Sequence, residues 1–301
     1  MVVGRHGAGV ALVLMTALAA CGGANPPPAQ GSITAPGRSA PPTHGAQLSS
    51  PAAPTPTAAV RIDTGRFSTA ASVAAELAAV EPMLASPTTP AALLDGLAHR
   101  QQVAYLVLTL HPGWGTAVLA AVPTALQPVV NANLTASADI GSLNGVATRT
   151  PSWRIVAPAT PDQLLGFYRE SQSRSGVPWQ YLAAINFVET RFGRIRGESS
   201  AGAQGPMQFL PSTWAEYGSG DINDAHDSIL AAGHFLQAHG APDDIAAALH
   251  AYNPSSLYVD GVTLYAQRMA ADARAFTAYH GWQVEVQLPD GYVTLPEGFV
   301  G

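Results

Sequence analysis

The sequence contains no lysine, and all 14 of its basic residues are arginines. This absence excludes Schiff-base and lysine-nucleophile chemistry. Only 11% of the 301 residues are charged, the formal net charge is −6, and no basic cluster is present, which argues against nucleic-acid binding. Cys21 is the one cysteine, so an intramolecular disulfide is excluded and the fold must be stabilised by packing.

The first 21 residues have the features of an export signal. Arg5 and His6 form a short positive region, and residues 10–20 form an apolar stretch that is too short for a permanent membrane span. Small residues then precede Cys21, in a pattern that resembles a bacterial lipoprotein signal. This predicts that residues 1–20 are a signal peptide and that lipidated Cys21 anchors the protein to a membrane surface. An ordinary secretory signal with an incidental cysteine is the alternative.

Composition divides the next part of the chain into two segments. Residues 21–60 are rich in Pro, Ala, Ser and Thr and have few large apolar residues, so they are predicted to be a disordered tether. Residues 61–147 are predicted to be a helical segment of unknown role, with helices over 90–110 and 116–134. A first helix is indicated by the spacing of Val73, Leu77, Val80 and Leu84. A Pro-Gly break divides the apolar stretch 103–126, which favours buried helices over a membrane span.

Residues 144–159 are irregular and are interpreted as a linker. The region 155–280 is predicted to be a nearly all-helical domain. Thr160-Pro161-Asp162-Gln163 has the pattern of a capping box and predicts a helix that ends near Gly176. Further helices are expected over 178–191, 211–217, 224–239, 242–252 and 255–279. In residues 281–301, alternating apolar residues around Pro289-Asp290-Gly291 predict a short hairpin or an ordered tail.

Glu189 lies on the apolar face of its predicted helix. Leu182, Ile185, Glu189 and Phe192 are spaced by three or four residues and therefore share one face. A carboxyl group buried there loses hydration, which raises its pKa toward the value that a general acid needs near neutral pH. From this pattern alone, an exposed Glu189 paired with an arginine of 191–196 remains an alternative.

A second polar motif follows at residues 199–214, Ser-Ser-Ala-Gly-Ala-Gln-Gly-Pro-Met-Gln-Phe-Leu-Pro-Ser-Thr-Trp. The glycines on either side of Gln204 allow close backbone approach, and the small residues leave room for a ligand. The amides and hydroxyls are suited to an uncharged polar ligand such as a sugar. Ala251-Tyr252-Asn253 follows at the end of a later predicted helix.

Glu-Thr-Arg-Phe at 189–192, the motif at 199–214 and Ala-Tyr-Asn, in this order, resemble the lytic transglycosylase family with a goose-type-lysozyme-like domain. The segments 189–194 and 220–224 are also similar to the membrane-bound lytic transglycosylase B branch. The resemblance covers about residues 160–270. Thr190 departs from the serine that often follows the glutamate in the family. Pro254-Ser255 replaces a glycine that often stands two residues after the Asn, a change that can reshape a subsite wall.

The resemblance implies a mainly α, lysozyme-like fold and a peptidoglycan lytic transglycosylase that needs no cofactor. Glu189 would protonate the glycosidic oxygen between N-acetylmuramic acid and N-acetylglucosamine, and the substrate's acetamido group would stabilise the cationic carbon. Glu189 would then take the proton of the muramoyl C6 hydroxyl, which yields a 1,6-anhydromuramoyl end without water. The protein would be exported and lipid-anchored, facing the cell wall.

The resemblance also implies positions that bind the glycan or orient the acid. These positions are Ser199, Gln204, Met207, Gln208, Tyr252 and Asn253. Tyr258 and Tyr265 lie on the last long predicted helix and are candidates either for holding Glu189 in place or for core packing.

Three alternatives remain open at the level of sequence. A muramidase would use the same acid with a second carboxylate, for which Glu198, Glu216 and Asp221 are available. A non-catalytic wall-binding lipoprotein would keep the fold. A metal enzyme is suggested by the grouped histidines His226, His234, His239 and His250 and by a faint calcium-loop pattern at 221–224. The chain has no His-Glu-x-x-His, however, and Ala232 occupies the twelfth loop position, so no metal site is predicted. Asp224 or Asp227 is instead expected to cap a helix.

Overall fold

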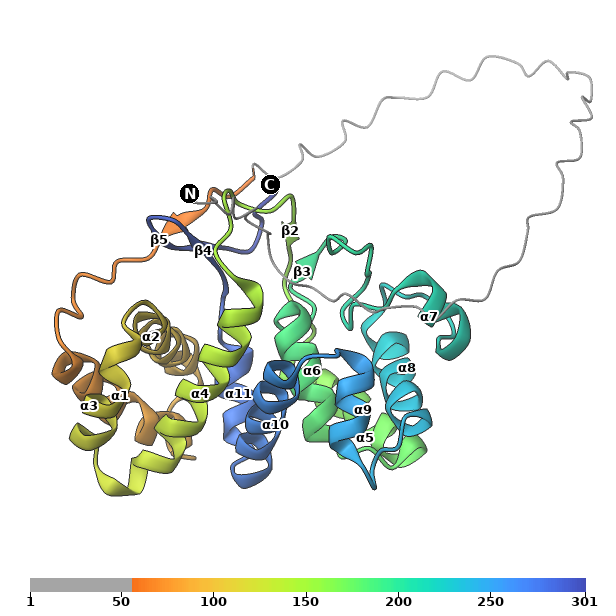
Figure 1. Ribbon diagram of the computed structural model, residues 1–301, viewed down its shortest axis with the longest axis horizontal. Coiled ribbons are helices and arrows are strands. Elements are labelled where there is room, and N and C mark those ends of the chain that lie inside the picture. The colour runs from red at the N-terminus through yellow and green to blue at the C-terminus, as the bar shows by residue number, and fades with distance from the viewer. Residues whose placement is uncertain (1–55) are drawn as a thin grey trace, which may run out of the picture. The chain divides into compact units, whose positions relative to one another are not determined.

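The computed structural model describes residues 56–301, which belong to one compact unit (Figure 1). The predicted signal peptide, Cys21 and residues 21–55 of the predicted tether lie outside the described residues. The fold is mainly α, as predicted, with a few short strands. In chain order the elements are β1 (Val60–Arg61), α1 (Ala70–Ala85), α2 (Ala91–Leu110), η1 (Pro112–Trp114), α3 (Gly115–Ala121), η2 (Thr124–Leu126), α4 (Gln127–Asn144), β2 (Arg154–Ile155), α5 (Pro161–Ser175), α6 (Trp179–Thr190), β3 (Ile195–Arg196), α7 (Pro211–Tyr217), α8 (Ala225–Ala238), α9 (Ile245–Tyr252), α10 (Ser256–Ala271), α11 (Arg274–His280), β4 (Val284–Leu288) and β5 (Gly291–Leu295).

The helices of the first segment follow the sequence prediction except at one proline. The four apolar positions predicted to share a face of α1 are all buried, and α2 has nearly the predicted bounds. The prediction of one continuous helix over 116–134 was wrong, because the helix is interrupted at Pro123. Val122 is extended, with ψ 151°, since the residue before a proline avoids the helical region. α4 then starts at Gln127 and continues ten residues beyond the predicted end.

No single helix within residues 56–301 meets the length and hydropathy needed to cross a bilayer. Only α2 taken together with Pro112–Ala121 reaches that threshold, and the two parts are bent by 104° at the break. In α2, Val103, Val107 and Leu108 are buried in the core, which confirms the prediction of buried helices.

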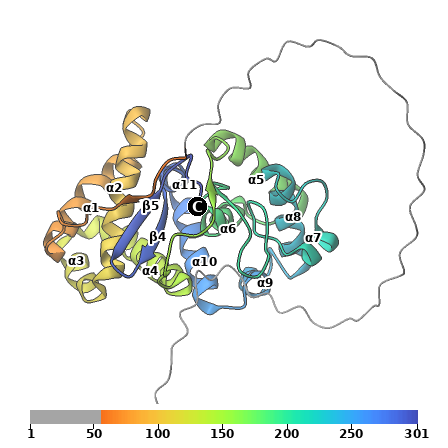
Figure 2. The ribbon, with the colours of Figure 1, turned by 90° about the horizontal axis from the view of Figure 1, so that it is seen from above.

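The first helical segment shares a hydrophobic core with the predicted catalytic region. α4 packs along α10, and α10 packs against α6, as the two ribbon views show (Figures 1 and 2). The crossing of α4 and α10 is close, because a Cβ atom placed on Gly261 would lie 2.8 Å from Cδ1 of Ile140. Trp282 reaches the same segment through a 2.9 Å hydrogen bond from its Nε1 to Oε1 of Gln101 on α2. α4 therefore supports the helix that carries Glu189 through α10.

Local capping signals predicted the starts of two helices of the second region, α5 and α8. Thr160 and Gln163 form the predicted capping box of α5, and Gly176 ends that helix in the left-handed conformation. The Asp224 side chain caps α8, as expected. The helix predicted over 242–252 begins only at Ile245, after Asp244 as its cap. The helix predicted over 255–279 was wrong in its length, because Asp272 is extended and separates α10 from α11. Its carboxylate accepts a hydrogen bond from the backbone of Arg274, which stabilises this turn.

Two small antiparallel sheets complete the fold. β4 and β5 form the predicted hairpin, and β1 adds a third strand next to β5, with Val60 opposite Thr294. The sheet thus includes the last residue of the segment predicted to be a tether. β2 pairs with β3, and a second hydrophobic cluster, which includes Trp153, Ile195, Val286 and Phe299, lies between these strands and the hairpin. The predicted linker 144–159 is ordered by this packing.

Candidate active site

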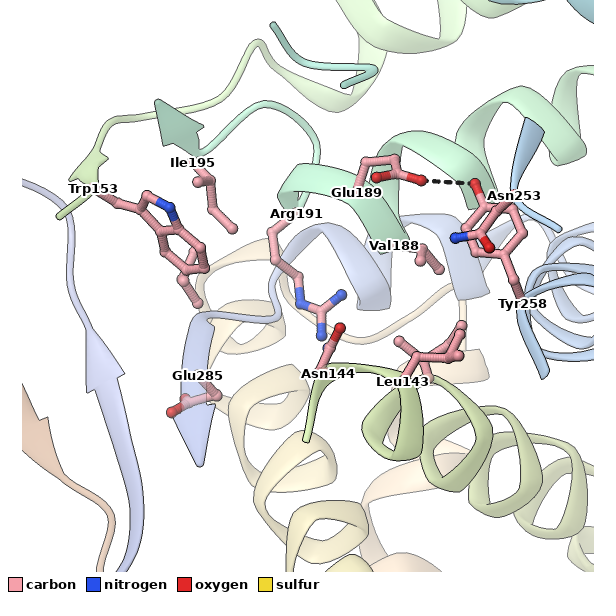
Figure 3. A pocket seen from close by; sticks show the side chains of 12 residues that line it. Leu143, Asn144, Trp153, Val188, Glu189, Arg191, Ile195, Asn253, Tyr258 and Glu285 are labelled. Atoms are coloured by element: carbon pink, nitrogen blue, oxygen red, sulfur yellow. Dashed lines mark hydrogen bonds between the residues drawn. The ribbon is translucent and has the colours of Figure 1, made fainter. Parts of the chain in front are cut away.

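Glu189 lies in the last turn of α6, and its side chain is buried. Only 4% of the residue is exposed, and burial raises the pKa of its carboxyl to about 8. Tyr258 of α10 donates a 2.8 Å hydrogen bond to Oε1 of Glu189, which lowers the same pKa in part (Figure 3). Among the described residues no arginine forms an ion pair with Glu189. The carboxyl is therefore mostly protonated at pH 7 and can donate a proton.

The chain reverses immediately after this acid through three successive residues with positive φ. Arg191, Phe192 and Gly193 have φ values of 52°, 62° and 84°. The turn is held because the amide of Phe192 donates to the carbonyl of Asn186 and the amide of Gly193 donates to Oγ1 of Thr190. Left-handed conformations cost free energy in residues other than glycine, and such strain concentrates at functional sites.

Thr190 and Asn186 tie α6 to the polar motif. Oγ1 of Thr190 donates a 2.6 Å hydrogen bond to the carbonyl of Pro206, and Nδ2 of Asn186 donates a 2.9 Å bond to the same oxygen. Tyr168 of α5 in turn donates to Oδ1 of Asn186, which fixes the amide. Thr190 therefore supplies a hydroxyl where the resembling family often has serine.

The motif forms a tight loop whose shape depends on Gly205. That residue has φ +75°, and a Cβ atom on it would lie 1.8 Å from the carbonyl oxygen of Ile222. The backbones of Gln204 and Phe209 pair with each other across the turn. Oγ of Ser199 accepts hydrogen bonds from the amides of Ala201 and Ala203 at 3.2 and 3.0 Å. The loop is thereby held in one conformation beside α6.

Tyr252 fixes the loop from the side of α9. Its hydroxyl donates a 2.6 Å hydrogen bond to the carbonyl of Met207, whose side chain is fully buried. Nε2 of Gln208 donates to the carbonyl of Gly205, whereas its buried Oε1 has no hydrogen-bond partner within residues 56–301. Gln204 is partly exposed and donates to Oε1 of Glu198. Direct glycan contacts by these residues stay predictions.

A pocket opens beside Glu189 and is lined by side chains from both halves of the described chain (Figure 3). Of the predicted site residues it contains Glu189 and Asn253, together with Tyr258. The sequence reasoning did not identify the other lining residues, which are Ile140, Leu143, Asn144, Trp153, Val188, Arg191, Ile195, Val284 and Glu285. Most of these are apolar or lie in segments predicted to be linker, tail or accessory helix, and no local pattern marked them.

The acids considered for a second catalytic carboxylate lie elsewhere. Glu198, Glu216 and Asp221 are all exposed, and none lines the pocket. The second acid in the pocket is Glu285 of β4, whose carboxyl accepts hydrogen bonds from Oγ1 of Thr294. Burial raises its pKa to about 8, so this group is also mostly protonated at pH 7.

Three of the four grouped histidines make separate contacts, and His250 is exposed. His226 contacts Glu170 and Asp227, His234 contacts the carbonyl of Tyr217, and His239 contacts the carbonyl of Phe235. Within the described residues, Asp224, His226 and Asp227 place ligand atoms within 4.8 Å of one another. Asp224 already accepts the amide of Asp227 as the helix cap, and Asp227 accepts the amide of Asp221.

Two comparisons with known proteins give a match to part of the chain. Residues 167–269 match the family described as the transglycosylase SLT domain. A membrane-bound lytic murein transglycosylase F of Thiobacillus denitrificans is 28% identical over 117 residues, which cover 36% of this chain and 25% of the relative. The chain thus spans about a quarter of that relative's length. The similarity to the B branch stays a prediction, since this relative is an F-type enzyme. No solved structure gives a significant match.

Proposed function

We propose that the protein is a peptidoglycan lytic transglycosylase in which Glu189 is the acid and base. The observation that carries this proposal is the buried Glu189 carboxyl, which has a pKa of about 8, lines a pocket and accepts a hydrogen bond from Tyr258, both residues lying in the part of the chain that matches the SLT family. An isolated buried acid destabilises a fold, so its presence in a pocket favours a catalytic role over a purely wall-binding one.

In the proposed reaction, protonated Glu189 donates to the glycosidic oxygen, and the bond between that oxygen and C1 of N-acetylmuramic acid breaks. The acetamido group of the same sugar stabilises C1. The Glu189 carboxylate then removes the proton of the C6 hydroxyl while O6 bonds to C1. The products are a free N-acetylglucosamine 4-hydroxyl and a 1,6-anhydromuramoyl end, and Glu189 regains its proton.

This route is favoured over hydrolysis by the positions of the other acids. The three candidates Glu198, Glu216 and Asp221 are exposed and lie outside the pocket. Glu285 lines the pocket, but its raised pKa keeps it mostly protonated at pH 7, which suits neither a nucleophile nor a base that activates water.

Digestion of purified sacculi by the protein and by its Glu189→Gln variant tests the proposal. Mass spectrometry of the released muropeptides should give anhydro ends, which are lighter than hydrolysed ends by one water, and the variant should release none. Hydrated ends would establish a muramidase instead. Equal release by both proteins would remove Glu189 as the catalyst.

We further propose that the protein acts at a membrane surface. The lipoprotein-like signal that ends at Cys21 supports a lipid anchor that faces the cell wall. Metabolic labelling with a fatty-acid probe should mark the protein and leave Cys21→Ala unlabelled. Labelling of both proteins would contradict the assignment of Cys21.

A further inference from the structure

Arg191 lies at the boundary of two pockets. Along with Ile140, Asn144 and Glu285, it lines both the pocket beside Glu189 and an adjoining one between α2, α4 and the β4–β5 hairpin. Among the described residues no carboxylate forms an ion pair with it. Its Nη1 donates a 2.9 Å hydrogen bond to the carbonyl of Phe187, and the guanidinium lies over the face of the Phe187 ring.

This guanidinium is unusual because the residue is partly buried and yet forms no ion pair within residues 56–301. Burial lowers the pKa of Arg191, and the more distant Tyr265 and Glu285 only partly offset that effect. The Glu285 carboxyl accepts from Thr294 and does not approach Arg191 closely enough for an ion pair. A desolvated cation is costly unless a negative group accompanies it, so the site is suited to an incoming anion.

The backbone turn after Glu189 directs this side chain. Arg191 is the left-handed residue that ends α6, so its side chain returns beneath the helix toward α4. Figure 3 shows the guanidinium in the pocket, with the Asn144 side chain pointing toward it. Leu143, Trp153 and Val284 surround this space with apolar groups, which strengthen an ion pair by excluding water. A planar guanidinium matches a carboxylate in two parallel hydrogen bonds.

We propose that Arg191, with the walls that α4, Trp153 and β4 add to the SLT domain, binds a carboxylate on the side arm of the muramoyl residue. This inference rests on the proposed function, because the sugar rings of peptidoglycan are uncharged and its carboxylates belong to the muramoyl lactyl group and the peptide attached to it. α4 and the hairpin lie outside residues 167–269, so this chain's additions to the SLT domain complete the subsite.

Calorimetric titration of the full chain carrying Glu189→Gln, which prevents turnover, tests the proposal. The three probes are a peptidoglycan tetrasaccharide with its peptides, the same tetrasaccharide freed of peptides and therefore bearing lactyl carboxylates, and uncharged chitotetraose. Adding Arg191→Gln should weaken binding of at least one anionic probe by about tenfold or more and leave chitotetraose unchanged. Weakening confined to the first probe assigns the carboxylate to the peptide, whereas weakening of the second assigns it to the lactyl group. Arg169→Gln, which removes an exposed arginine, should change none of the three affinities.

A second variant keeps the proposal falsifiable if Arg191→Gln weakens the fold. Asn144→Asp places a carboxylate toward the intact guanidinium and should compete with the anionic probes while chitotetraose still binds. Equal loss of all three probes in both variants, or no loss in either, overturns the proposal. Cleavage of sacculi by the protein without the Glu189 substitution is measured separately. Absence of cleavage refutes the proposed function. Cleavage by this protein, together with probe affinities that Arg191→Gln does not change, refutes the carboxylate subsite alone.

Discussion

Glu189→Gln is expected to stabilise the fold at neutral pH while it abolishes cleavage. The folded state raises the pKa of this carboxyl from 4.5 to about 8, so the folded protein binds its proton more tightly than the unfolded chain does. The resulting stability is fully present below pH 4.5 and is lost as the pH rises toward 8. Each pKa unit corresponds to about 1.4 kcal/mol, so the wild-type protein loses up to about 3 kcal/mol at pH 7. Glutamine does not titrate and can still accept the hydrogen bond of Tyr258.

Thermal unfolding monitored by circular dichroism between pH 4 and pH 8 measures this effect. The melting temperatures of wild type and Glu189→Gln should nearly coincide at pH 4 and differ by about 5–10 °C at pH 7, with the variant higher. Glu216→Gln makes the same substitution at an exposed position and should show no such growing difference. A difference independent of pH, or a wild type more stable than the variant at pH 8, would refute the assignment of a buried, protonated Glu189.

Three further substitutions probe the parts that hold this acid. Tyr258→Phe removes the hydrogen bond that lowers the pKa of Glu189. The alkaline limb of the pH profile of kcat/KM on sacculi should therefore move to higher pH, and the rate should fall by about tenfold. An alkaline limb at the wild-type pH would contradict this role of Tyr258. Gly205→Ala should lower the free energy of unfolding in urea by more than about 2 kcal/mol, because it combines a positive φ with a backbone overlap. Gly202→Ala, at φ +81°, meets open space and should lower it by about 1 kcal/mol. Equal losses would show that the overlap at Gly205 relaxes freely. Thr190→Val leaves the amide of Gly193 without its partner and removes one of the two donors to the carbonyl of Pro206, so it should cost about 1–3 kcal/mol. Thr190→Ser should cost less than half as much, and equal losses in urea unfolding would assign the effect to packing.

The parts of the fold that could be predicted are those that depend on residues close together in the sequence. The capping box at Thr160 and Gln163 and the helix end at Gly176 are local arrangements and were predicted correctly, and Asp224 is the cap of the two that were considered. The break at Pro123 also had a local signal, but the apolar spacing on both sides of it favoured a continuous helix. The division at Asp272 depends on its side chain accepting a hydrogen bond from the backbone of Arg274, which the helical periodicity of the region concealed.

Only the part of the candidate site that lies within residues 167–269 could be predicted from the sequence. Glu189 could be identified because its burial follows from the apolar spacing of its own helix. Asn144, Trp153 and Glu285 were missed because they reach the pocket through packing between segments more than 30 residues away in sequence. A residue such as Arg191 was visible, but whether it pairs with an acid depends on tertiary neighbours that spacing does not reveal.

The aromatic cluster around Phe187 limits how residues 167–269 can be expressed apart from the rest of the chain. Phe187, two residues before Glu189, stacks on Tyr279 at 5.1 Å and meets Trp282 edge-on, and Trp282 is hydrogen-bonded to Gln101 of α2. Excision at the family limits of 167–269 would strip these partners from the back of the acid-bearing helix and leave its rings in water. A portable unit must begin before α1 and end after the hairpin, so recombination that exchanges only the SLT portion would yield aggregates in place of a new enzyme.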